Sequence, residues 1–132
     1  MMHLGLLIIR LVIGLTFAAH GTQKLFGWFG GHGVKGTAGF FESIGIKPGA
    51  AMAILAGLGE LAGGLFFAAG FLTPLASLLI VVPMLVAIFT VHGKNGYLAT
   101  GGYEYNLALI AIAVGIALTG PGAYSLDAAL FA

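Results

Sequence analysis

The chain has 132 residues, of which 60% are hydrophobic and only 7% are charged. Because a soluble domain carries about 25% charged residues, this composition is typical of a membrane protein. The formal net charge of +1 provides no basic surface for nucleic acid, and the lack of cysteine excludes thiolate catalysis, iron–sulfur ligation and covalent haem attachment.

Four apolar segments predict an all-α fold, a bundle of four transmembrane helices. A spanning helix needs about 20 residues, so the second and third segments fit directly and the other two are slightly short. No linker divides the chain, and we therefore expect residues 1–132 to form one integral domain in a lipid bilayer. The predicted spans cover about 4–20, 49–72, 74–92 and 104–119.

The first predicted span carries Arg10 inside its apolar run and has no Lys or Arg before it, so we expect it to be retained rather than cleaved. A stripe of residues at spacings of 4, 3, 4 and 3 shares one helix face. We expect this face to line the bundle interior. The stripe consists of Arg10, Gly14, Phe17, Gly21 and Lys24.

A long connection, His20–Lys47, follows the first span and is rich in glycine and aromatic residues. So many aromatic side chains favour an interfacial or partly re-entrant segment, with Trp28 at headgroup depth. Within this segment, Thr37–Ile44 is expected to form a short helix.

Glu60 is the only charged residue of Gly49–Leu72. A carboxylate near the bilayer midplane costs at least about 2.5–3.5 kcal/mol, so such a group pairs, neutralises or lines a functional cavity. A stripe of small residues surrounds it and predicts that it points into the bundle. The stripe consists of Ala53, Gly57, Gly64 and Ala68.

Two interpretations of Arg10 and Glu60 stay open at this point. One is a structural ion pair that fixes helix packing. The other makes Glu60 a proton acceptor or a hydrogen-bond partner of a bound small molecule.

The third span begins at Thr73-Pro74, which predicts a helix cap and a first-turn proline, and Pro83 should kink it. The fourth span begins near Glu104 and ends at Gly120-Pro121-Gly122. The tyrosines around Glu104 are expected to be interfacial anchors. Alternatively, Tyr103-Glu104-Tyr105-Asn106 forms the polar rim of a pocket.

His20 and His92 end the first and third spans, and Glu104 begins the fourth, so alternating span directions place all three at one end of the bundle. Two imidazoles from neighbouring helices can ligate a b-type haem. Interfacial histidines with ordinary hydrogen bonds are the more frequent case, and no ligand spacing predicts a metal site.

The basic residues also predict an orientation. Lys24, Lys35, Lys47 and Lys94 fall on one face of the membrane, and the opposite face has no lysine. The positive-inside rule then places loops 21–48 and 93–103 in the cytoplasm and both termini outside.

Several motifs along almost the whole chain resemble the DoxX family of membrane proteins. This resemblance implies a four-helix protein of the plasma or inner membrane, associated with quinone-linked sulfur oxidation, terminal oxidases or redox stress. Many members carry an oxidoreductase label. The motifs are Arg10-Leu11 with Gly14, His20-Gly21-x-x-Lys24-Leu25-Phe26-Gly27, Phe41-Glu42-x-x-Gly45, Glu60-x-x-Gly63-Gly64, Gly70, Met84, His92 and Gly120-Pro121-Gly122.

The leading hypothesis is a membrane subunit of a quinone-linked redox system, either an oxidoreductase or an accessory to one, with other redox subunits as partners. Glu60, His20 and His92 are the candidate catalytic residues, which would handle protons. The candidate ligand-binding residues are Arg10, Lys24, Glu104 and Asn106. Glu104 comes from helix geometry rather than from the resemblance. A quinone is the favoured cofactor, with haem b as the weaker alternative.

Two other classes of function stay open. One is a non-catalytic scaffold that recruits soluble redox enzymes. The other is a small-molecule or proton-coupled transporter with Glu60 as its relay, for which a homo-oligomer would widen the path.

Overall fold

The computed structural model describes residues 1–98 and 102–131, and within these every regular element is helical. Residues 99–101, part of the predicted loop 93–103, and Ala132 lie outside the described residues. The elements in chain order are α1 (Met2–Phe26), η1 (Trp28–Gly30), α2 (Gly33–Ser43), α3 (Gly49–Ala69), α4 (Thr73–Ala87), the π-helical turn η2 (Ile88–His92), η3 (Gly93–Asn95), α5 (Glu104–Thr119) and α6 (Leu126–Phe131).

Three helical stretches are long and apolar enough to cross a membrane: Met2–Phe26, Gly49–Ala69 and Thr73–Asn95. The first runs to Phe26 rather than ending near the predicted residue 20. Helix α5 is apolar but has only 16 residues, or about 24 Å at 1.5 Å per residue, which is less than the roughly 30 Å of a hydrocarbon core.

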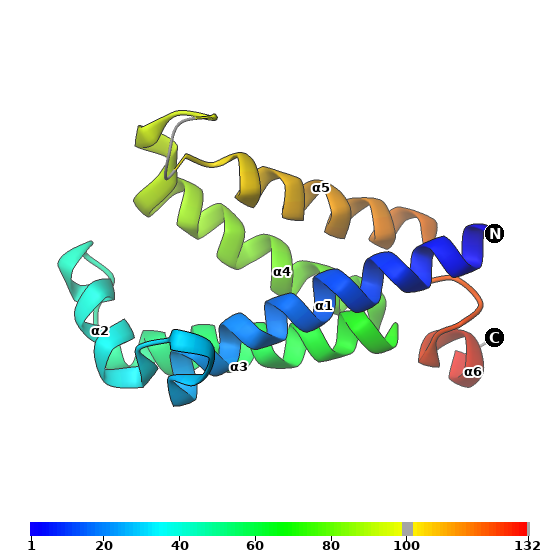
Figure 1. Ribbon diagram of the computed structural model, residues 1–132, viewed down its shortest axis with the longest axis horizontal. Helices are drawn as coiled ribbons and strands as arrows, with labels where there is room; N and C mark the ends of the chain where they lie inside the picture. The colour runs from blue at the N-terminus through cyan, green and yellow to red at the C-terminus, as the bar shows by residue number, and fades with distance from the viewer. Residues whose placement is uncertain (99–101, 132) are drawn as a thin grey trace.

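The long helices form two pairs, as Figure 1 shows. Helix α1 packs along α3, α4 packs along α5, and the short α3–α4 turn connects the pairs. The pairs spread apart toward the end that carries α2, whereas both termini lie at the opposite end.

Glycine allows α1 and α3 to approach closely. A Cβ atom on Gly14 would lie only 2.5 Å from the carbonyl oxygen of Gly64 and 2.6 Å from the backbone nitrogen of Ala68. The predicted interior stripe of α1 is buried at Arg10, Gly14, Phe17 and Gly21. The small-residue stripe around Glu60 is buried throughout.

The hydrophobic core joins the two pairs near the α3–α4 turn. It contains Phe17 from α1 and Phe67 from α3, both at most 2% exposed, together with small and branched residues from α4 and α5. These are Ala76, Ile80, Leu109, Ala113 and Ile116. The core is concentrated at this end, whereas the two pairs stand apart at the other end.

Acidic side chains from other elements cap the N-termini of α3 and α4. Oε2 of Glu42 in α2 accepts a hydrogen bond from the Gly49 amide at 3.1 Å. Asp127 in α6 accepts from the amides of Leu72 and Thr73 at 2.7 and 2.9 Å. The prediction that Thr73 caps α4 is wrong, because Thr73 is already helical and its hydroxyl donates to Asp127 at 2.6 Å.

The connection between α1 and α3 is more helical than predicted, since α2 begins at Gly33 rather than Thr37. Trp28 and Phe29 are 56% and 73% exposed. In the third span, α-helical geometry continues past Pro83 to Ala87 and then changes to the π-helical turn η2. Pro83 therefore lies inside a continuous α-helix, and the helix changes its geometry only after Ala87, in the turn that contains His92.

Candidate functional site

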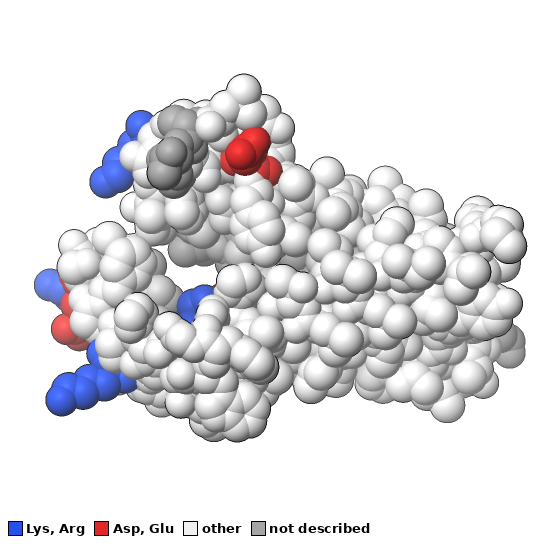
Figure 2. Space-filling view, viewed as in Figure 1, with Lys and Arg blue, Asp and Glu red and all other residues white. Residues whose placement is uncertain are grey.

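A cavity of about 910 Å³ lies between the two helix pairs, at the end where they spread apart. Figure 2 shows this opening as a hollow between the ends of the two helix pairs, and the basic side chains of the visible face lie around this end. Residues from α1, α2, α3, α4, η2 and α5 line the cavity. Ligand pockets typically occupy about 300–1,000 Å³, so a small organic molecule would fit.

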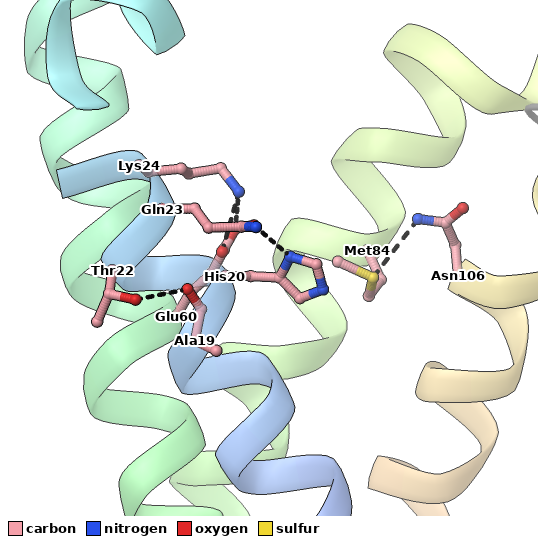
Figure 3. Close-up of polar contacts among 8 residues, drawn as sticks. All are labelled: Ala19, His20, Thr22, Gln23, Lys24, Glu60, Met84 and Asn106. Carbon is pink, nitrogen blue, oxygen red and sulfur yellow. Dashed lines mark hydrogen bonds and ion pairs between the residues drawn. The ribbon is translucent and has the colours of Figure 1, made fainter. Parts of the chain in front are cut away.

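An ion pair between α1 and α3 forms the charged wall of this cavity (Figure 3). Nζ of Lys24 lies 2.8 Å from Oε1 and 2.9 Å from Oε2 of Glu60. Glu60 is 3% exposed, whereas the side chain of Lys24 is 26% exposed. The lysine is therefore the member of the pair that a ligand in the cavity would meet more easily.

The extension of α1 beyond residue 20 is what places Lys24 beside Glu60. A Cβ atom on Gly21 would lie 2.5 Å from the Leu61 amide nitrogen, so the two backbones are in direct contact one turn before Lys24. At this separation a lysine side chain spans the gap to the carboxylate. The pair thus depends on glycine at position 21.

His20 lies one turn before Lys24 and also lines the cavity. Its Nδ1 is 2.9 Å from Oε1 of Gln23, and Nε2 of Gln23 donates to the Phe29 carbonyl at 3.1 Å. The amide oxygen therefore accepts from Nδ1–H, which leaves Nε2 as the acceptor of the neutral imidazole. Figure 3 shows the ring extending from α1 into the space facing Met84 and Asn106.

The second helix pair supplies the opposite wall. His92 of η2 is half-buried and lines the cavity. Asn106 is 5% exposed, and its Nδ2 donates to Sδ of Met84 at 3.5 Å. Tyr105 also lines the cavity and interacts electrostatically with Glu60.

The interpretation that pairs Arg10 with Glu60 is wrong, because the carboxylate pairs with Lys24. Arg10 lies fourteen residues before Lys24 on the same helix, about 21 Å away. It is fully buried at the other end of the bundle, where its Nη2 donates to the Tyr124 carbonyl. Its charge also acts on Asp127 of α6. The spacing along α1 put Arg10 on the correct face but not at the same depth.

The structure brings together most of the predicted site residues and separates two of them. Arg10 is remote, and Glu104 is exposed and does not line the cavity. The functional roles of all seven residues stay predictions. The five that share the cavity are His20, Lys24, Glu60, His92 and Asn106.

Sequence reasoning missed two residues that fix other groups by hydrogen bonds. Gln23 holds His20, and its position three residues later on a helix is a signal that could have found it. Asp127 gave no local signal, since its partners lie more than 50 residues away. Of the predicted rim Tyr103-Glu104-Tyr105-Asn106, Tyr105 and Asn106 line the cavity, whereas Tyr103 and Glu104 do not.

Histidine and acidic side chains do not cluster tightly around one point. Across residues 1–98 and 102–131, no group of three or more His, Cys, Asp or Glu residues has the geometry to hold a metal ion. His20 and His92 do line the same cavity from opposite walls.

Comparison with known proteins connects this geometry to a family. The model of the DoxX family matches residues 5–93, which include His20, Lys24, Glu60 and His92. The chain belongs to the DoxX family. Asn106, on the second wall of the cavity, lies outside residues 5–93, the part of this DoxX chain that the family model matches.

One curated relative of this DoxX chain is "Putative oxidoreductase CatD" of Bacillus subtilis (strain 168). It is 31% identical over 128 residues, which cover 97% of the chain and 88% of that protein. No solved structure matches the chain significantly. Family membership and the apolar helices together make it a multi-pass membrane protein.

Proposed function

We propose that this protein is the membrane subunit of a quinone-linked redox system, and that residues 1–132 form its single integral domain in the cell membrane. The observation that supports this most directly is the ion pair of Lys24 and Glu60 at the wall of a cavity of about 910 Å³. A quinone head group is a flat apolar ring with two carbonyl oxygens. It would use the apolar lining for the ring and Nζ of Lys24 as a donor to one oxygen.

Proton handling follows from the same geometry. Oxidation of a quinol releases two electrons and two protons. Nε2 of His20 is available to accept one proton, and the Glu60 carboxylate can accept the other if Lys24 moves toward the ligand. His92 and Asn106 would orient the ring from the second wall.

Electrons must also pass from the quinol to an acceptor. The chain has no cysteine for an iron–sulfur cluster, and residues 1–98 and 102–131 contain no strand from which a flavin- or nicotinamide-binding sheet could be built. We therefore propose that a partner subunit carrying a haem, flavin or metal centre accepts the electrons. The oxidoreductase label of the Bacillus relative agrees with this role.

The test is to identify small molecules that co-purify with the protein in mild detergent. We expect extraction and mass analysis to recover a quinone from the wild type and much less from Lys24→Met. Lys94→Met is the matched control, because Lys94 lies at the same end but does not line the cavity. If no quinone is recovered and added quinone does not bind, the proposal is wrong. A Soret band in the absorption spectrum that is lost in His20→Ala would instead assign the cavity to haem.

A further inference from the structure

The cavity does not end at the polar cluster but continues between α3 and α4 to the outside of the bundle. Four apolar residues that line it are also strongly exposed. Leu55 on α3 is 62% exposed, and Leu78, Val82 and Val86 on α4 are 55%, 48% and 45% exposed. A side chain that both lines a cavity and faces outward marks the edge of an opening.

This opening faces lipid rather than water. Its edge residues belong to the two apolar stretches Gly49–Ala69 and Thr73–Asn95, each long enough to span a membrane. The four exposed residues at its outer edge are leucines and valines, and none of them is charged. Acyl chains are therefore the medium into which the cavity opens.

Gly59 lies at the inner edge of this opening, one residue before Glu60. It lines the cavity, and a Cβ atom built on it would meet nothing within 4 Å. The other inward glycines of α3 differ, because a Cβ on Gly57, Gly63 or Gly64 would collide with a neighbouring helix. Helix packing explains those three glycines but does not explain Gly59.

We propose that the α3–α4 opening, bounded by Leu55, Gly59, Leu78, Val82 and Val86, is a lateral portal for the hydrophobic tail of the ligand. The polar head then lies at Lys24 and Glu60, and the tail passes over Gly59 into the bilayer. This inference rests on the proposed function, and it specifies the ligand class as a ring head group that carries a long alkyl or isoprenoid tail. Such a ligand enters from the membrane.

The test compares two probes with the same benzoquinone ring, one with a decyl tail and one without a tail, titrated into protein in lipid nanodiscs. Gly59→Phe is designed to fill the opening, since a Cβ atom at this position meets nothing within 4 Å. We expect it to weaken binding of the tailed probe at least about tenfold, because the tail loses its apolar contacts, while the tailless probe binds as before. Val82→Trp narrows the opening from α4 and should have the same effect.

Gly115→Phe is the matched control. Gly115 is also a helical glycine with open space around its Cβ, but it lies on α5 and does not line this cavity. We expect this variant to bind both probes as the wild type does.

Each other outcome contradicts a specific statement. If Gly59→Phe and Val82→Trp bind both probes normally, or lose both equally, the portal is wrong while the head-group site stands. If the wild type binds the two probes with equal affinity, the tail does not use the opening, and the portal is wrong while the head-group site stands. If the wild type binds neither probe, the proposed function fails and the portal fails with it.

Discussion

Lys24 and Glu60 differ in how well water or the open cavity could solvate each charge if its partner were removed. Glu60 is 3% exposed, so an unpaired carboxylate there would remain buried. The Lys24 side chain is 26% exposed and can turn its ammonium toward the open cavity. Because an isolated buried charge is costly, the two single substitutions should not be equivalent.

We expect Lys24→Met to lower the free energy of unfolding by about 3 kcal/mol, because it leaves Glu60 buried without a counter-charge. Glu60→Gln should cost only about 1 kcal/mol. The double variant should recover most of the loss. Reversible unfolding in mixed micelles measures these values, with Lys35→Met, at an exposed position on α2, as the control. Equal losses in the two single variants would contradict the burial argument.

Asp127 stabilises the opposite end of the bundle. Burial alone would raise the pKa of its carboxyl, but hydrogen bonds from Thr73 and Leu72 and the positive charge of Arg10 leave the pKa below its ordinary value. A lowered pKa means that the ionised form is favoured in the folded state. The carboxylate therefore contributes to the free energy of unfolding at any pH above the pKa of Asp in the unfolded chain, which is about 3.9. This contribution is lost as the pH falls through the lower pKa of the folded state.

Substitution of Asp127 should therefore release the C-terminal segment. We expect Asp127→Ala to cost about 1–2 kcal/mol, the usual cost of losing a helix cap, and to speed amide exchange at Leu72 and Thr73. Wild-type protein should show the same faster exchange only below about pH 4, and Asp127→Asn should lack this acid dependence. Unchanged exchange in Asp127→Ala would contradict the capping role.

The α1–α3 pair is the element on which the site depends. Its backbones touch at Gly14 and again at Gly21, and the second contact brings Lys24 to Glu60. Backbone atoms cannot swing aside as a flexible side chain can. A methyl group at either contact must therefore push the helices apart.

We expect Gly14→Ala to destabilise the protein by about 2–3 kcal/mol, because its Cβ would lie 2.5 Å from the Gly64 carbonyl oxygen. Gly5→Ala on the same helix should be neutral or stabilise by up to about 1 kcal/mol, since a Cβ there meets nothing within 4 Å and alanine favours helix. Unfolding measurements on both variants check this. Equal effects would show that helix contact does not constrain position 14.

At the scale of the whole molecule, the two helix pairs meet near the termini and separate at the lysine-rich end (Figures 1 and 2). The core of Phe67, Ile80 and Leu109 fixes the closed end. The open end combines the cavity with the basic and aromatic side chains that suit a membrane interface. The half of the bundle near the termini is therefore well packed, and the half at the lysine-rich end contains the cavity.

The charge distribution predicts a topology. We expect both termini to lie outside the cell, with α2 at the cytoplasmic interface, because the lysines gather at that end. A reporter that is active only outside the cytoplasm should be active when fused to the C-terminus and inactive when inserted in the α1–α3 connection. The reverse pattern would overturn the orientation but not the site.

Periodicity along single helices was enough to predict which faces are buried. Arg10 and Phe17 on α1, and Ala53 and Glu60 on α3, are all buried as their spacing indicates. Helix α5 is apolar as its sequence indicates, but its 16 residues are short for a bilayer. Periodicity indicates which face of a helix a residue occupies but not which residues of two helices lie at the same depth, so it did not show that Glu60 pairs with Lys24 rather than with Arg10.

The sequence by itself determined that this is an all-helical membrane protein with a buried acid on its second span, because hydropathy and helical spacing are local properties. Only the tertiary structure decided that Lys24, rather than Arg10, pairs with that acid, and that Asp127 caps α4. Those partners lie 36 and 54 residues apart, and their meeting depends on helix register and on glycine contacts between helices. The opening beside Gly59 has the same origin, since empty space between two helices is a property of neither helix alone.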